Sequence, residues 1–64
     1  MDAKKTIGQE IRRARRAKDL TQAELAALLN YTPQTIHAWE KGKYLPSILV
    51  YEKLKEILEI MEKT

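Results

Sequence analysis

The chain has 64 residues, a net charge of +3 and no cysteine. A chain of this length forms one small domain, and without thiols it has neither disulfides nor thiolate metal sites, which favours a reducing cytoplasm. Its longest apolar run, residues 25–29, is far too short to cross a bilayer, and its N-terminus has no apolar signal region. We therefore expect a single soluble, cytoplasmic domain over residues 1–64.

Positive charge is concentrated in the first 46 residues. They carry nine Lys or Arg against five acidic residues, whereas residues 47–64 carry three against four. A basic front and a slightly acidic tail suit a polyanion that is bound from one side. An ordinary solvated surface would explain the same charges, so charge alone leaves both interpretations open.

The first predicted helix runs from about residue 6 to residue 18. Thr6 and Gln9 have the spacing of a capping box, although the acidic residue at position 2 could cap an earlier start. Apolar residues at positions 7, 11 and 14 share one face of this helix. We interpret Arg12, Arg13 and Arg16 as a solvated face, from which one side chain could reach a phosphate.

Residues 21–42 predict two short helices joined by a tight turn. Thr21 and Glu24 form a capping box at the start of the first helix. Thr32 caps the second, and Pro33 suits its first position because the missing N–H would have no partner there. Gly42 offers a left-handed cap after the second helix. Both helices therefore have their start signals in the sequence.

The spacing of small, turn and apolar residues in this stretch is that of a helix-turn-helix. Ala26 is small where the second helix passes closely over the first, and Asn30 tolerates the left-handed conformation of the turn. We expect Tyr31, Ile36 and Trp39 to fill the wedge between the two helices. Trp39 is accordingly interpreted as a core residue rather than as a platform for stacking bases.

A last helix is expected from about residue 47 to residue 62, with Ser47 as its cap. It has more apolar residues than one core-facing stripe needs. We interpret the surplus as a surface for self-association, with a dimer interface formed by Val50, Leu54, Ile57 and Met61. The alternative is that these residues only close the core of one chain. No segment of the chain alternates with period two, so we expect an all-α fold.

A long run of the chain resembles the phage-repressor and Cro-like helix-turn-helix family (XRE type) of transcription regulators: residues 7–47, IGQEIRRARRAKDLTQAELAALLNYTPQTIHAWEKGKYLPS. Its most specific parts are LTQAELA at residues 20–26 and WEKGK at residues 39–43. The resemblance implies a compact bundle of four or five helices, whose second and third form the helix-turn-helix. It also implies a homodimeric repressor of bacterial, archaeal or phage origin that binds specific sequences in double-stranded DNA.

By the same resemblance, the recognition helix falls on residues 33–41, and its N-terminal end enters the major groove. Gln34 is the best direct reader, because its amide can pair bidentately with adenine. Thr35 and His37 can bond a base or a phosphate. Pro33 and Ala38 can make only apolar contact, for example with a thymine methyl group.

The resemblance also implies contacts with backbone phosphates around that helix. Gln22 matches a family position that bonds a phosphate with help from the helix N-terminus. Two lysines match a loop that touches the backbone. The full set expected to bind phosphates is Thr21, Gln22, Thr32, Lys41, Lys43 and Tyr44.

The remaining polar residues favour structure over catalysis. In this family Glu40 pairs with an arginine of the first helix, here Arg15. The only histidine, His37, cannot form a metal site alone and could equally be a solvated side chain. Without a Gly-rich phosphate loop or two acids that share a substrate, we expect no enzyme, cofactor, metal, membrane or small-molecule ligand. The rival function is a protein-interaction module, such as an antitoxin or coactivator, that uses the apolar last helix.

Overall fold

This computed structural model describes residues 3–59. Within them it has four helices joined by loops, and no strand. They are α1 (Ala3–Ala17), α2 (Gln22–Leu29), α3 (Pro33–Glu40) and α4 (Ile48–Leu58). The predicted all-α class is therefore confirmed. Helix α1 begins a turn earlier than expected, and α4 ends at residue 58 rather than 62, because the next residue is left-handed with φ 53°.

The expected caps are present at three helix starts. In α2 the Thr21 hydroxyl accepts from the Glu24 N–H at 3.0 Å, and the Glu24 carboxylate accepts from the Thr21 N–H at 2.8 Å. The hydroxyl of Thr32 accepts from a backbone N–H at 3.3 Å in α3, as does that of Ser47 in α4. These bonds satisfy N–H groups that have no partner inside the helix.

Each of the four helices is followed by a left-handed residue, which is Glu59 for α4 and, for the first three, Asp19, Asn30 and Gly42. The first three ends share one arrangement. In each case the N–H of the following residue donates to the carbonyl five positions earlier, with N···O distances of 2.9–3.1 Å. This is the Schellman arrangement, which satisfies carbonyls at the helix end. The left-handed Asn30 and Gly42 were expected from the sequence, whereas the left-handed Asp19 was not.

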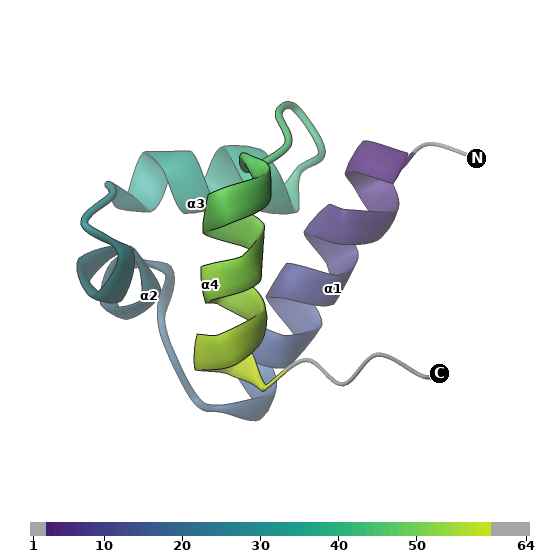
Figure 1. The fold of residues 1–64 in the computed structure, drawn as a ribbon. Coiled ribbons are helices and arrows are strands. Elements are labelled where there is room, and N and C mark those ends of the chain that lie inside the picture. The colour runs from purple at the N-terminus through teal and green to yellow at the C-terminus, as the bar shows by residue number, and fades with distance from the viewer. Residues whose placement is uncertain (1–2, 60–64) are drawn as a thin grey trace.

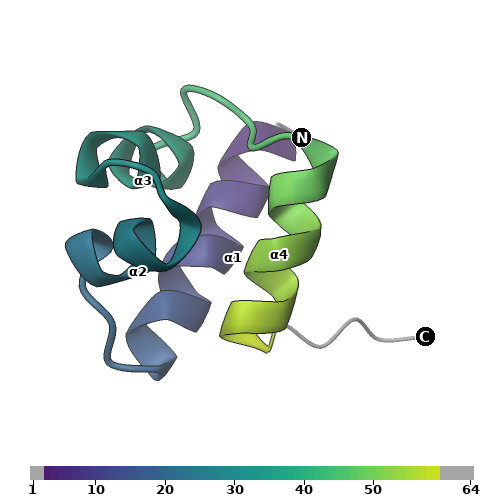
Figure 2. The same cartoon turned by 60° about the vertical axis from the view of Figure 1, so that its left-hand side comes forward.

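The helices are arranged around α1. Helix α3 packs against α1 and α2, and α4 packs against α1. Figures 1 and 2 show α1 and α4 side by side and running in the same direction, while α3 crosses at their upper end with α2 below it. No helix among residues 3–59 combines the length and apolar character needed to cross a membrane. This packing leaves one long side of α3 facing outward.

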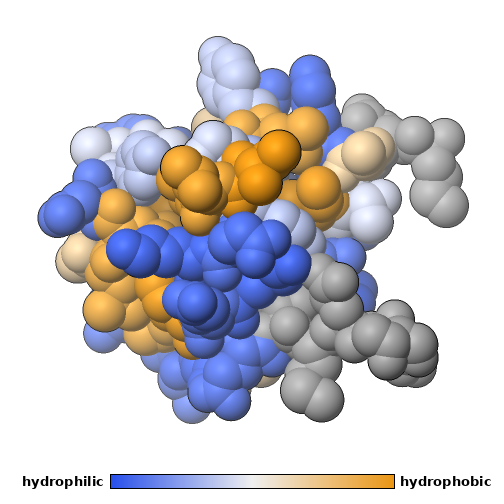
Figure 3. Space-filling view, viewed as in Figure 1, coloured by the Kyte–Doolittle hydropathy of each residue, from blue (hydrophilic) through white to orange (hydrophobic). Residues whose placement is uncertain are grey.

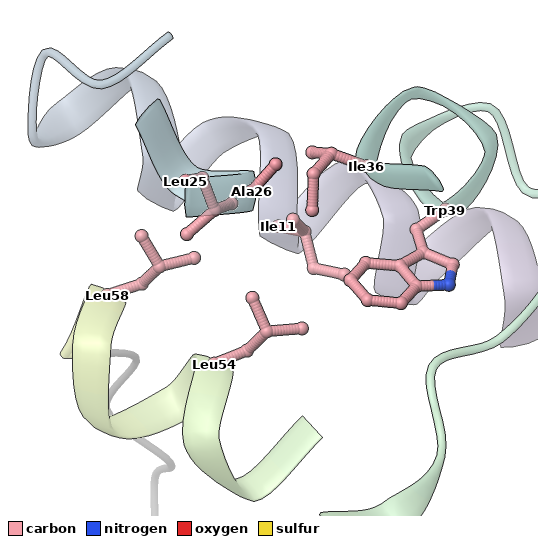
Figure 4. Packing of buried hydrophobic residues seen from close by; sticks show 7 residues of the cluster. All are labelled: Ile11, Leu25, Ala26, Ile36, Trp39, Leu54 and Leu58. Atoms are coloured by element: carbon pink, nitrogen blue, oxygen red, sulfur yellow. The ribbon is translucent and has the colours of Figure 1, made fainter. Parts of the chain in front are cut away.

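All four helices contribute to one core, drawn in Figure 4, whose buried apolar members are Ile11, Leu25, Ala26, Ile36, Trp39, Leu54 and Leu58. Tyr31 was expected to fill the wedge between α2 and α3, but 43% of it is exposed. Only the edge of its ring packs on Trp39, with centroids 5.3 Å apart. Ile36 and Trp39 are buried as expected, whereas Tyr31 lies at the surface beside Trp39.

The assignment of Leu54 to a dimer interface is wrong. Leu54 is 0% exposed and points with Leu58 into the core of its own chain (Figure 4). Val50 and Ile57 are half-buried against the same core, and Met61 lies outside the described residues. A single chain therefore uses this stripe of α4 to close its own bundle.

Helices α1 and α3 approach each other at Gly8, a position that the sequence analysis did not single out. Gly8 is buried, and a Cβ placed on it would lie 2.3 Å from the carbonyl oxygen of Trp39 and 2.8 Å from that of Glu40. Only a residue without a side chain fits at this distance. Gly8 thus sets how closely the C-terminal end of α3 sits on α1.

Candidate nucleic-acid interface

The outward side of α3 carries four of the five predicted base readers. They line one shallow hollow together with residues of α2 and the loop after α3: Gln22, Pro33, Gln34, His37, Ala38, Lys43 and Tyr44. None of these seven residues is acidic. Helical spacing explains the grouping, since positions 34, 37 and 38 share a face opposite the buried Ile36 and Trp39.

Thr35 is the predicted reader that does not join this face. It is half-buried, and its hydroxyl lies 3.0 Å from the hydroxyl of Thr32. Its backbone N–H also donates to Thr32. Thr35 therefore takes part in capping α3, on the side of the helix away from the shared hollow.

The predicted phosphate-binding residues lie at three different places around α2 and α3. Lys43 and Tyr44 are exposed and line the hollow beside the readers, whereas Lys41 lines a neighbouring hollow between α1 and α3. Thr21 and Thr32 stand at the N-termini of α2 and α3, where free N–H groups and the helix dipole favour an anion. Of the six residues, the structure thus brings Gln22, Lys43 and Tyr44 to the hollow of the readers, whereas Lys41 lines the neighbouring hollow and Thr21 and Thr32 line neither.

Arg15 and Glu40 form the expected ion pair between α1 and α3. Arginine Nε donates to Glu40 Oε2 at 2.6 Å and Nη2 to Oε1 at 3.1 Å, in a bidentate arrangement. Their side chains are 11% and 5% exposed. Arginine Nη1 also donates to the carbonyl of Leu20 at 2.7 Å, which ties the start of α2 to the pair.

The ion pair with Glu40 raises the pKa of Arg15. Its hydrogen bond with Glu40 is the largest cause that raises the pKa of Arg15, the attraction of the two charges raises it further, and burial opposes both. Gln22 completes the network, because its amide nitrogen donates to Glu40 Oε1 at 3.1 Å. Nothing in the sequence indicates this bond. It fixes the side chain of Gln22 while leaving a second N–H for a phosphate.

We refer to the outward face formed by Pro33, Gln34, His37 and Ala38 as the reading face, after the role predicted for it. His37 is exposed at its edge and lines both hollows. Within residues 3–59 no group of three His, Cys, Asp or Glu residues is placed to hold a metal ion. The described surface around α3 is thus a set of hydrogen-bonding and positively charged groups on a rigid helix pair, which is chemistry for recognising a polyanion.

Comparison with known proteins agrees with this geometry. A family model described as helix-turn-helix matches residues 11–60. The HTH-type transcriptional regulator y4dJ of Sinorhizobium fredii is 32% identical over 60 residues, which cover 94% of this chain and 78% of that protein.

Two eukaryotic proteins are also similar. Vegetative-specific protein H7 of Dictyostelium discoideum is 40% identical over 55 residues, covering 86% of this chain and 53% of that protein. Multiprotein-bridging factor 1b of Arabidopsis thaliana is 44% identical over 52 residues, covering 81% and 37%. The chain thus spans about half of the first and little more than a third of the second. No solved structure gives a significant match. By sequence and by fold, the chain belongs to the XRE-type helix-turn-helix family.

Proposed function

We propose that the chain is a sequence-specific DNA-binding transcription regulator that reads the major groove with α3. The observation that carries the proposal is the shared face of Pro33, Gln34, His37 and Ala38, flanked by Lys43 and free of acidic side chains. A helix of this width fits the major groove, where each base pair presents a distinct set of donors and acceptors. Such a regulator is not an enzyme, and it acts where DNA is, in the cytoplasm of a prokaryote or the nucleus of a eukaryote.

Within this face the residues have separate tasks. Gln34 reads adenine through its amide, and Pro33 and Ala38 contact thymine methyl groups. Lys43 neutralises a phosphate and sets the register of α3 on the duplex without reading sequence. Thr35 supports the start of the helix rather than a base, since its hydroxyl lies against that of Thr32.

The first test distinguishes a residue that contacts a base, Gln34, from one that contacts a phosphate, Lys43. Binding sites are selected from a random duplex pool, and affinities are measured by fluorescence anisotropy over a range of salt. Gln34→Ala should cost about 1–3 kcal/mol on the best site and relax preference at one base pair. Lys43→Ala should weaken all sequences alike and reduce the salt slope by about one contact. If the two variants behave identically, this division of tasks is wrong; if the wild type prefers no duplex, the proposed function fails.

We further propose that the chain is a repressor that binds as a homodimer through the loop after α3 and the start of α4. Four large apolar residues are exposed there: Tyr44 at 66%, Leu45 at 44%, Ile48 at 81% and Leu49 at 82%. Figure 3 shows hydrophobic side chains over the start of α4, next to a strongly hydrophilic surface. A helix-turn-helix dimer binds two half-sites about one helical turn apart, roughly 34 Å, and the homodimer is expected to need such a pair. Covering promoter DNA in this way supports repression.

Substitution of the patch distinguishes it from the core. Leu49→Lys should shift sedimentation equilibrium toward the monomer while changing the free energy of unfolding by less than about 0.5 kcal/mol, as for other surface positions. Leu54→Ala should instead destabilise the fold by about 2–5 kcal/mol, because it empties space in the core. A wild type that stays monomeric both in solution and on DNA with two half-sites would contradict the homodimer.

A second candidate function is a protein-interaction module, and the same patch favours it. One relative is named a multiprotein-bridging factor, and this chain matches 37% of its length. In that case the chain would be an antitoxin or a coactivator. The patch around Ile48 and Leu49 would bind its partner, a toxin or a transcription factor, while α3 still binds DNA. A monomeric wild type that nevertheless binds a specific duplex would favour this candidate.

A further inference from the structure

A second hollow lies beside the reading face, between α1 and the end of α3. Its lining includes Arg12 and Arg16 from α1, Lys41 just after α3, and the ion pair of Arg15 with Glu40. It shares its two other lining residues, Gln22 and His37, with the reading face. We refer to the three exposed cations Arg12, Arg16 and Lys41 as the α1 arginine site.

The positive charge of this site is not neutralised by the part of the chain that the structure describes. Glu40 is the only acid in the lining, and both its oxygens are engaged by Arg15. Among residues 3–59, the ion pairs involve Arg15, Lys18 and Lys55, and none involves the three cations of the site. The hollow therefore presents about three positive charges toward solvent.

This arrangement costs stability when no anion is bound. Arg12 and Arg16 stand four positions apart on α1, and like charges at that spacing destabilise a helix. Lys41, from a different element, adds a third like charge to the same hollow. An ordinary solvated helix face does not explain why a cation from a second element lines the same hollow. An anion bound between the two elements would explain all three positions.

We propose that the α1 arginine site binds a backbone phosphate of DNA just outside the sequence that α3 reads. Guanidinium groups match phosphate oxygens in a bidentate geometry, and exposed arginines make such contacts at little desolvation cost. Because Gln22 and His37 border both hollows, a strand that follows the reading face continues past this site. The inference rests on the proposed DNA-binding function and extends its footprint onto α1.

The test compares two variants that lose the same charge. Arg12→Gln with Arg16→Gln removes the site, and Arg13→Gln with Lys53→Gln is the control, since neither of those residues lines this hollow. All four positions are exposed, so neither variant should lose stability, and the site variant should unfold at or slightly above the midpoint of the wild type because the repulsion between positions 12 and 16 is gone. Affinity for the selected duplex is measured against salt. The site variant should lose about 0.9 from the slope of log K against log salt for each phosphate contact removed, and the control much less.

Neutral phosphate analogues then locate the contact. In a series of duplexes, each with a single methylphosphonate, the wild type and the control should weaken at one flanking position, whereas the site variant should be indifferent to that position. Equal slopes for site and control variants, or equal sensitivity to every methylphosphonate, would overturn the inference and leave the proposed function intact. Absence of any duplex binding by the wild type would instead defeat the proposed function.

A free anion is the remaining occupant to be tested. Inorganic phosphate is titrated into the full chain without DNA while the arginine Nε resonances are followed by NMR. Weak, unsaturated shifts up to tens of millimolar support a site that needs the DNA strand for affinity. Saturable binding of inorganic phosphate below 1 mM, together with a salt slope unchanged in the Arg12 and Arg16 variant, would overturn the assignment to DNA.

Discussion

Gly8→Ala is expected to lower the free energy of unfolding by about 3 kcal/mol, although alanine is the better helix former. The propensity gain is about 1 kcal/mol. It is outweighed because the new Cβ would stand 2.3 Å from the carbonyl oxygen of Trp39, and the obstacle is backbone rather than a side chain that could rotate away. A domain of 64 residues has only about 3–10 kcal/mol in total. Urea titration, followed by the fluorescence of Trp39, the only tryptophan, measures the loss.

Gln9→Ala is the matched control, because position 9 is adjacent on α1 and exposed. It should change stability by less than about 0.5 kcal/mol. Gly8→Ala should also weaken specific DNA binding in the fraction that remains folded, since separation of α1 from α3 tilts the reading helix. An unchanged or raised midpoint for Gly8→Ala would show that the two helices do not approach as closely as the structure has them.

Local signals in the sequence were sufficient for both ends of α2 and α3 and for the start of α4, but not for the start of α1 or the end of α4. Thr21, Thr32 and Ser47 cap helices because their hydroxyls accept bonds from N–H groups within three residues, and such bonds depend on nothing distant in the chain. Asn30 and Gly42 end helices for a similar local reason. The helix-turn-helix and its outward face follow from these boundaries and from helical periodicity.

What the sequence could not decide depends on distances between helices. The apolar stripe of α4 fits either a dimer seam or the closing of one core, and only the position of α1 shows that Leu54 is buried. Gly8 reads as an ordinary small residue until Trp39 is found against it. The sequence also gives no sign of the bond from Gln22 to Glu40, since it joins two residues that are 18 positions apart, one on α2 and one on α3.

Two features hold the C-terminal end of α3 against α1. One is Gly8, which the sequence does not mark, and the other is the ion pair of Arg15 with Glu40, which the family resemblance implies. Gly8 allows α3 to sit on α1 at Glu40, and the bidentate pair with Arg15 fastens it there. Gln22 extends the fastening to α2. These contacts hold the buried side of α3 to both neighbouring helices and so fix the orientation of its outward face. If α3 reads DNA as proposed, stability and recognition depend on the same residues.

Glu40→Gln is expected to destabilise the fold by about 3 kcal/mol, near the lower end of the cost of breaking a buried ion pair. The amide has nearly the shape of the carboxylate but leaves the charge of Arg15 without a partner in a site where the side chains are 11% and 5% exposed. Gln22 also loses a charged acceptor. The measurement is again urea unfolding followed by Trp39 fluorescence. Specific DNA affinity should fall more than nonspecific affinity, because only specific binding requires α3 to keep a fixed orientation.

Glu59→Gln is the control, since it breaks the ion pair of Glu59 with Lys18 at an exposed position. The hydrogen bond with Lys18 lowers the pKa of Glu59, and the attraction of the charges lowers it further. Solvent screens this exposed pair, so the unfolding midpoint should hardly move.

Replacing both buried partners, Arg15→Met with Glu40→Leu, should recover stability relative to Glu40→Gln, because no unpaired charge remains. Specific DNA binding should not recover with it, because the anchored contacts to Gln22 and to the Leu20 carbonyl are gone. A Glu40→Gln variant as stable as Glu59→Gln would mean that the pair between α1 and α3 does not hold the reading helix.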